Sequence, residues 1–180
     1  IDNDCYIMGI LNVTPDSFSD GGKWNSLDKA LAHTEQMIKE GASIIDVGGE
    51  STRPGYTKIT DEEETERTVP VIEAIRARFD VPISIDTYKS RVAKAAIKAG
   101  ADLVNDIWGL KYDENIAGVA AKYNKPVCIM HNRKEIPVDE NGCVYSLENY
   151  LNLIETELEE SIQIALNAGI SREQIILDPG

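Results

Sequence analysis

Polar side chains stand at the ends of short apolar runs along most of this sequence. Such a run is typical of a buried strand, and a carboxylate, amide or imidazole at its end is costly unless it has partners or a task. In a parallel sheet these ends meet on one rim, where together they could bind a polar small molecule. The residues concerned are Asn12, Asp46, Asp86, Asn105 with Asp106, His131 with Asn132, and Asp178. Any one of them could instead be a helix cap, and we expect Asp46 and Asp106 to be structural.

Two segments that follow the first two apolar runs add groups suited to an anion. Segments 14–22 and 50–56 are rich in hydroxyls, glycine and proline, and the second contains the lone Arg53. Hydroxyls and a guanidinium on a rim favour binding of an anionic group. The pairs Gly21-Gly22 and Gly48-Gly49 permit close backbone approach or loop motion. Pro54-Gly55 by itself would fit an ordinary turn.

Apolar runs and amphipathic stretches alternate from one end of the sequence to the other. The expected strands are 6–11, 43–47, 82–85, 103–105, 127–130 and 175–177. Residues 41–46 resemble residues 100–105, which indicates a repeated β/α unit. Repeated units of this kind predict either a barrel or a doubly wound open sheet. Neither GxGxxG nor GxxxxGK[ST] occurs, which weakens the nucleotide-binding version of the open sheet.

The amphipathic stretches predict four helices with readable ends. A stripe over 27–38 begins after Ser26 and ends at Gly41, and a short helix over 91–99 ends at Gly100. The capping pattern that begins at Thr60 starts another helix, in which Pro70 predicts a kink or a break. A long helix runs from about 146 to 168. Its expected inward residues are Leu147, Leu151, Ile154, Leu158 and Ala165.

Composition excludes several classes of protein. The 180 residues predict one domain over 1–180, and a net charge of −13 argues against nucleic acid and anionic membranes as partners. The sequence has no apolar run near the length of a membrane span and shows no secretory signal. Three cysteines (Cys5, Cys128 and Cys143) lack CxxC spacing. We therefore expect a reduced, cytoplasmic compartment without disulfides or a structural zinc site.

Six segments together resemble the dihydropteroate synthases, a family of pterin-binding enzymes, in family order. They are 7–22, 41–55, 83–87, 104–107, 129–131 and 176–180. The resemblance implies an α/β fold, the TIM (β/α)8 barrel, of which this chain covers about the first six β/α units. The single domain over 1–180 would then be C-terminally incomplete, and we expect the 180-residue segment to be inactive by itself.

The resemblance also implies a transferase of folate biosynthesis. Such an enzyme condenses 6-hydroxymethyl-7,8-dihydropterin diphosphate with 4-aminobenzoate to give 7,8-dihydropteroate and diphosphate, in a reaction that depends on Mg²⁺. Asn12 matches the metal-associated asparagine. The positions implied to be catalytic are Asp86, Asn105, Asp178 and Arg53. The positions implied to contact substrates are Thr52, Asp86, Asn105, Asp178, Ser51, Arg53, Pro54, Phe18, Ile107 and Met130.

Two other functions stay open at the level of sequence. One is a pterin-binding methyltransferase domain, which segments 14–22 and 51–55 disfavour because a methyl donor has no diphosphate to bind. The other is an inactive paralogue that only binds pterin. If the leading interpretation holds, we expect small-molecule partners, competition by sulfonamides and, for the full-length protein, a homodimer.

Overall fold

Six parallel strands form one sheet whose spatial order is their order in the sequence. The computed structural model describes residues 5–14, 22–51, 58–133, 137–138 and 141–180. Each strand pairs with the next one along the chain, and β1 and β6 are the edge strands. A doubly wound sheet would reverse its strand order part of the way across. The observed order is that of successive units of a (β/α)8 barrel.

All six expected strands are present. They are β1 (Met8–Asn12), β2 (Ile44–Gly48), β3 (Ile83–Asp86), β4 (Leu103–Asp106), β5 (Val127–Met130) and β6 (Ile175–Asp178). Their ends differ from the predicted ones by no more than two residues. Strands β1, β3, β4 and β6 include the polar residue that closes their apolar run, and β2 includes Gly48.

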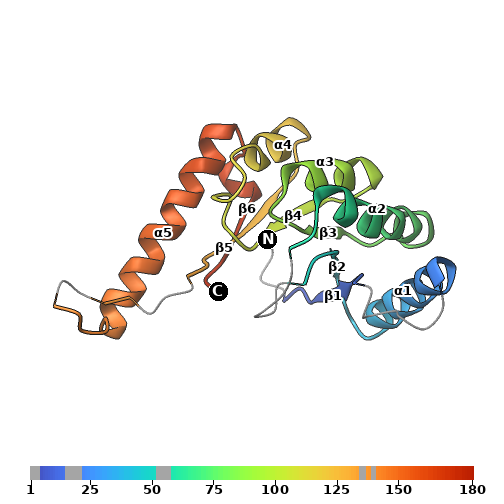
Figure 1. Ribbon diagram of the computed structural model, residues 1–180, viewed down its shortest axis with the longest axis horizontal. Helices are drawn as coiled ribbons and strands as arrows, with labels where there is room; N and C mark the ends of the chain where they lie inside the picture. Colours follow the sequence, from blue (N-terminus) through green and yellow to red (C-terminus); the bar gives the residue numbers. More distant parts are fainter. Residues whose placement is uncertain (1–4, 15–21, 52–57, 134–136, 139–140) are drawn as a thin grey trace.

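Helices cover one side of the sheet and form an arc around it (Figure 1). They are α1 (Gly22–Lys39), α2 (Asp61–Arg78), α3 (Ser90–Ala99), α4 (Ile116–Lys122) and α5 (Leu147–Ala168), with a 3-10 turn at Arg172–Gln174. The sequence did not predict α4. Helices on one side only are the arrangement of a barrel wall and its outer ring.

The helix ends follow the expected signals in most places. The hydroxyl of Thr60 accepts a hydrogen bond from Glu63 N at 3.1 Å, and Ser146 caps α5 in the same way through Asn149 N at 3.2 Å. The expected start at Ser26 is wrong, because α1 already begins at Gly22. Of the kink or break expected at Pro70, the break is wrong. Helix α2 continues through it, and the buried residues that follow the proline hold its second half against the core.

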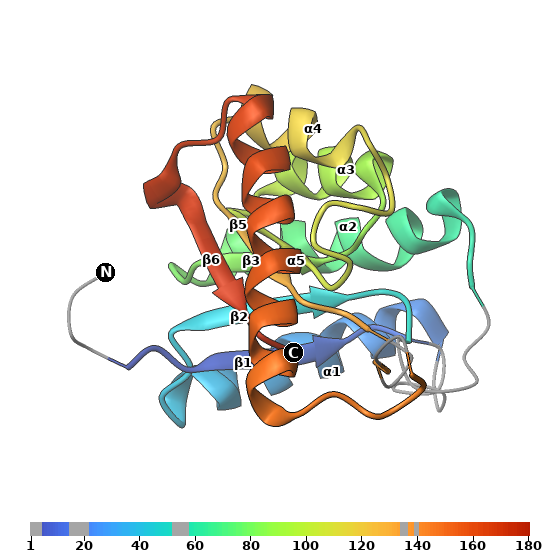
Figure 2. The ribbon, with the colours of Figure 1, turned by 90° about the vertical axis from the view of Figure 1, so that its left-hand side faces the viewer.

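Helix α5 packs on the sheet through its second half only. Leu158 and Ala165 are buried as predicted, but Leu147 and Leu151 are 74% and 51% exposed. Their predicted inward orientation is therefore wrong. The first half of α5 projects away from the other helices in Figure 1, and Figure 2 shows the helix crossing in front of the sheet. A regular apolar stripe therefore continues where the described part of the fold offers nothing to pack against.

The two faces of the sheet differ in chemistry. Residues that point toward the helices are aliphatic and fully buried, including Ile45, Val47, Ile83, Ile85, Val104 and Ile129. The alternate residues point to the inner face, and they include Asp46, Asp86 and Asn105. On this inner face Ile10 of β1 is 64% exposed and Ile176 of β6 is 37% exposed. Hydrophobic packing thus holds the sheet from outside, while the inner face is open and carries the polar groups.

None of the helices in the described ranges combines the length and apolar composition that crossing a membrane requires.

Candidate functional site

Strand register places one row of site residues across four neighbouring strands. Asn12 of β1 pairs with Gly48 of β2, Gly48 pairs with Asp86 of β3, and Asp86 pairs with Asn105 of β4. Residues in register lie side by side and point to the same face of a parallel sheet. The row therefore brings an amide, a carboxylate and a second amide together on the inner face, near the carboxyl ends of the strands.

Gly48 leaves the space into which these groups point. A methyl group built on Gly48 would lie 3.3 Å from Asp86 Oδ2 and 3.6 Å from Asn12 Oδ1. The side chains of two different strands therefore converge over a residue that has no side chain. Because Gly48 has no side chain, a ligand can approach its backbone closely beside these two polar groups.

Burial and neighbouring carboxylates change the protonation of Asp86. They raise its pKa to about 7, first through burial and then through the negative charges of Asp46 and Glu64. A carboxyl group with such a pKa is charged and uncharged in similar proportions at neutral pH. It favours a ligand that supplies hydrogen-bond donors or positive charge.

Asp46 holds one member of the row, Asn105, in position. Asn105 donates a hydrogen bond from Nδ2 to Asp46 Oδ2 at 3.1 Å, which fixes the orientation of the Asn105 amide. Burial raises the pKa of Asp46, although nearby Ser84 and Asn105 oppose the change. Asp46 is structural, as expected, but it orients another residue of the site and does not cap a helix.

Asp106 has the structural role that its position at a strand end suggested. Its side chain is completely buried on the helix side of the sheet, opposite to Asn105. Its two carboxylate oxygens accept hydrogen bonds from Trp108 N at 2.8 Å and Leu110 N at 2.9 Å. Burial raises its pKa to about 6. Asp106 therefore shapes the turn after β4 and does not belong to the open row.

A second level of the site lies nearer to the rim. Asp178 of β6 pairs with Met130 of β5, two residues beyond the pair of Cys128 with Ile176 that continues the first row. Ile107 follows Asn105 by two residues and comes directly after the end of β4. These three residues are half-buried. The structure therefore places an acid and an apolar residue in register one level beyond the row, with a second apolar residue just after β4.

Cys128 lies in the continuation of the row but is not an activated thiol. Burial and the charges of Asp178 and Asp46 raise its pKa to about 11. A thiol with this pKa is protonated at neutral pH and is a poor nucleophile.

The sequence did not single out a buried ion cluster behind the rim. Lys89, which follows β3, places Nζ 2.8 Å from Glu50 Oε2 and 2.6 Å from Glu64 Oε2. Both carboxylates are buried, and Tyr88 donates its hydroxyl hydrogen to Glu50. The cluster joins the end of β2 to the first turn of α2. The only sequence signal was a lysine beside the expected strand end at Asp86, which is too common to be specific.

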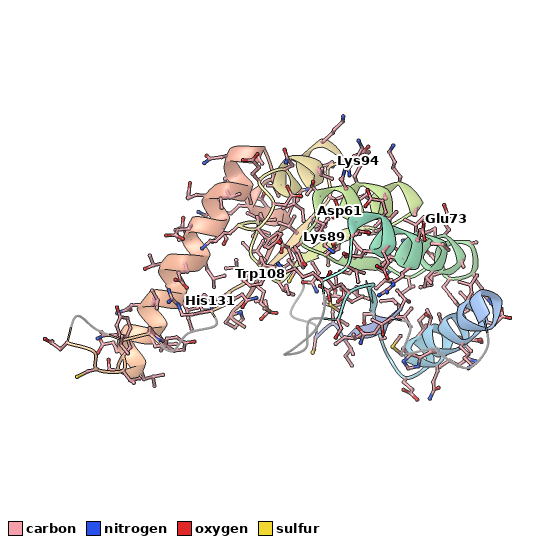
Figure 3. All side chains as sticks on the ribbon, viewed as in Figure 1. Asp61, Glu73, Lys89, Lys94, Trp108 and His131 are labelled. Atoms are coloured by element: carbon pink, nitrogen blue, oxygen red, sulfur yellow. The ribbon has the colours of Figure 1, made fainter. Side chains whose placement is uncertain are left out.

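A second contact that the sequence did not predict joins β5 to α5. His131 Nε2 lies 2.6 Å from Glu157 Oε2, and Arg133 pairs with the same carboxylate. These side chains and Met130 line a cavity of about 380 Å³. Figure 3 shows His131 beside α5 and Lys89 near Asp61 at the start of α2, so the two charged contacts lie apart from one another.

Several expected positions lie outside the described residues. They are Phe18 of segment 14–22 and Thr52, Arg53 and Pro54 of segment 51–55. Ser51, the last described residue after β2, is half-buried and follows Glu50 directly.

Within the described ranges no three His, Cys, Asp or Glu side chains are grouped as a metal site. Asn12 is exposed at the end of β1, so its amide oxygen is accessible to a ligand or a cation.

Comparisons with known proteins show which family this chain resembles. The family model described as pterin binding enzyme matches residues 8–180. A dihydropteroate synthase from Clostridium beijerinckii is 58% identical over 175 residues, which cover 97% of this chain and 62% of that protein. This chain therefore spans less than two thirds of the length of that relative.

Solved structures give the same result. A Clostridium difficile dihydropteroate synthase solved in the presence of pteroic acid has a TM-score of 0.92 and 48% identity, and the match covers 100% of this chain and 66% of that one. A Xanthomonas albilineans dihydropteroate synthase with 4-aminobenzoic acid has a TM-score of 0.87 and 39% identity over 99% of this chain and 62% of that one. Sequence and fold agree, and the chain belongs to the pterin-binding enzyme family.

Proposed function

We propose that this chain is the pterin-binding part of a dihydropteroate synthase. The complete protein would join 6-hydroxymethyl-7,8-dihydropterin diphosphate to 4-aminobenzoate. The observation that carries the proposal is the row Asn12–Gly48–Asp86–Asn105, with Asp178 one level above it. Two of the similar solved structures were obtained with pteroic acid, the oxidised form of the proposed product, and with 4-aminobenzoic acid, one of the proposed substrates.

The row suits the edge of a reduced pterin. The ring system presents an amino group and ring N–H groups, and carboxylates and amide oxygens accept hydrogen bonds from them. Asp86 and Asp178 supply carboxylates and Asn105 supplies an amide that can both donate and accept. The apolar side chains of Ile107 and Met130 would then pack against the faces of the ring.

The same groups support the proposed reaction. The bond between the pterin methylene carbon and the diphosphate oxygen breaks, and diphosphate leaves with the electron pair. The amine nitrogen of 4-aminobenzoate forms the new bond and loses a proton. Positive charge develops on the pterin as diphosphate leaves, and the carboxylates of Asp86 and Asp178 stabilise it. This route needs no covalent intermediate with the enzyme, which agrees with the protonated thiol of Cys128.

Asn12 fits the expected role beside the diphosphate. Asn12 is exposed at the strand end, and its amide oxygen lies close to Gly48, as does the carboxylate of Asp86. An amide oxygen together with substrate phosphates is a common way to hold Mg²⁺. The bound ion would neutralise charge on the diphosphate. We also propose that Thr52 and Arg53 act near the diphosphate and 4-aminobenzoate, and that Ser51, Pro54 and Phe18 contribute to the same region.

The wider features follow the same proposal. The complete enzyme would be cytoplasmic, would form homodimers, and would be inhibited by sulfonamides as mimics of 4-aminobenzoate. The 180-residue chain by itself would turn over little or no substrate.

The proposal is tested in the complete enzyme, meaning this chain together with the further part that its relatives have. Dihydropteroate formation and diphosphate release are measured for the unaltered enzyme and for Asp86→Asn and Asp178→Asn. We expect each variant to weaken pterin binding by about a hundredfold, because each loses charge-assisted hydrogen bonds to the ring. The exposed Glu155→Gln of α5 is the matched control.

Three results would contradict the proposal. Pterin affinity that is unchanged in both aspartate variants would exclude the assigned site. Binding of pterin diphosphate without product would instead support an inactive paralogue. Methyl transfer without release of diphosphate would support the methyltransferase alternative.

A further inference from the structure

A carboxylate on α5 reaches beyond its own helix to the end of β5. Glu157 contacts His131 at 2.6 Å and also pairs with Arg133. His131 is only 7% exposed, so this contact differs from an ordinary surface ion pair. Burial by itself raises the pKa of the Glu157 carboxyl group, but hydrogen bonds from Arg133 and His131 outweigh it and lower the pKa. Glu157 therefore stays ionised at neutral pH and holds the imidazole in place.

The backbone of His131 is connected directly to Asp178. His131 N donates a hydrogen bond to Asp178 O at 2.8 Å, which extends the β5–β6 pairing one residue beyond Met130 and Asp178. The position of His131 therefore influences where β6 ends.

The turn after β6 makes this connection tighter. Asp178 Oδ1 accepts a hydrogen bond from Gly180 N at 2.9 Å. Gly180 has a φ of +87°, and a Cβ built on it would lie 2.5 Å from the carbonyl oxygen of His131. Only glycine fits such a conformation and such an approach. The turn that orients the Asp178 carboxylate therefore packs against the backbone of His131.

We infer that Glu157 is a positioning residue for the pterin-binding carboxylate of Asp178, and that it acts through His131. This inference rests on the proposed function, in which Asp178 binds the pterin. Glu157 would not contact the substrate. It fixes the imidazole, the imidazole fixes the end of β5, and the end of β5 fixes the turn that holds the Asp178 side chain.

A purely structural role for the contact predicts a different outcome. The second half of α5 is already attached to the sheet by buried Leu158, Ile162 and Ala165. Because these contacts do not involve Glu157, removing the carboxylate charge should leave the helix in place. The effect should therefore appear in pterin binding and much less in stability.

The experiment compares Glu157→Gln, His131→Gln and the double variant in the complete enzyme, with Glu155→Gln on the exposed side of the same helix as control. The measured quantities are the dissociation constant for the pterin substrate, the KM for 4-aminobenzoate, kcat and the melting temperature. We expect Glu157→Gln to weaken pterin binding about tenfold, as a lost charged hydrogen bond would. The KM for 4-aminobenzoate should change by less than about twofold, since that substrate does not contact Asp178.

The double variant tests whether the effect passes through His131. If it does, adding Glu157→Gln to His131→Gln produces no further loss of pterin affinity. Additive losses would overturn the inference, as would unchanged pterin affinity in Glu157→Gln. Equal losses for both substrates with a matching fall in melting temperature would show a structural role and would also overturn it. An unaltered enzyme that forms no dihydropteroate would instead contradict the proposed function.

Discussion

At the scale of single residues, two opposing effects meet at Asp86. A charged carboxylate favours binding of the proposed pterin ligand, whereas burial disfavours the charged form. The pKa of Asp86 is raised to about 7 by burial and by the neighbouring carboxylates. Between about pH 4 and pH 7 the unfolded chain has released a proton that the folded chain retains. The stability contributed by this proton is complete below pH 4 and is lost as the pH rises through 7.

Asp86→Asn should therefore stabilise the fold at high pH while it weakens pterin binding. The amide has nearly the same shape and no charge to bury. Between pH 5 and pH 8 the unaltered chain should lose up to about 3 kcal/mol of unfolding free energy more than the variant does. Urea unfolding followed by circular dichroism at both pH values measures the difference. The raised pKa of Asp106 is common to both proteins and cancels. Parallel pH dependence in the two proteins would show that Asp86 titrates normally.

A second prediction at this scale concerns Gly48. In Gly48→Ala the added methyl group would lie 3.3 Å from Asp86 Oδ2 and 3.6 Å from Asn12 Oδ1, beside the polar groups that the proposed ligand would contact. We expect a loss of pterin affinity of about tenfold or more, with a change in unfolding free energy below about 1 kcal/mol. Titration with the pterin substrate checks the first value and urea unfolding the second. Gly118→Ala, where a methyl group meets no other atom within 4 Å, is the control.

At the scale of elements, charged side chains join the strand ends to the helices. Lys89 is the clearest case, because its ammonium group is enclosed by the carboxylates of Glu50 and Glu64 and by the carbonyl oxygen of Ile59. Removing one partner of such a buried group leaves charge without compensation, which costs more than the intact cluster contributes.

Lys89→Met should destabilise the fold by about 3 kcal/mol or more at pH 8. The loss should become smaller toward pH 5, because without the cation the pKa values of the two carboxyl groups rise and protonation removes the repulsion between them. Unfolding by urea at both pH values tests this. Lys94→Met is the control, since Lys94 is exposed on α3 and its loss should cost less than about 0.5 kcal/mol. Equal effects of the two substitutions would show that the buried cluster contributes little.

At this scale, some features could be predicted from the sequence and others could not, and the difference has physical reasons. Local patterns and the geometry of parallel strands predict the strand positions, the cap at Thr60, the start of α5 near Ser146 and the row of polar strand ends. The contact of Glu157 with His131 and the enclosure of Lys89 could not be predicted in this way. Glu157 is 26 positions from His131, and Lys89 is 39 positions from Glu50, so each contact depends on packing that no local pattern encodes. The continuity of α2 through Pro70 likewise depends on tertiary contacts that outweigh a local preference.

At the scale of the whole molecule, the sheet is a curved wall with one packed face and one open face. The edge strands β1 and β6 expose Ile10 and Ile176 on that open face. Exposed apolar side chains beside unpaired strand edges favour association with another sheet. We therefore expect the 180-residue chain, studied by itself, to form oligomers as its concentration rises and to bind the dye ANS.

Ile10→Thr should reduce this association, because threonine retains the preference for a strand and removes much of the apolar surface. Val144→Thr is the matched control, since Val144 is 67% exposed but lies outside the six-stranded sheet. Sedimentation velocity at increasing concentration, with ANS fluorescence in parallel, measures the effect. A chain that stays monomeric, or an equal effect of both substitutions, would show that the open face does not drive association. A selective effect of Ile10→Thr would show that the face carrying Asn12, Asp86 and Asn105 is also the face through which the isolated chain associates.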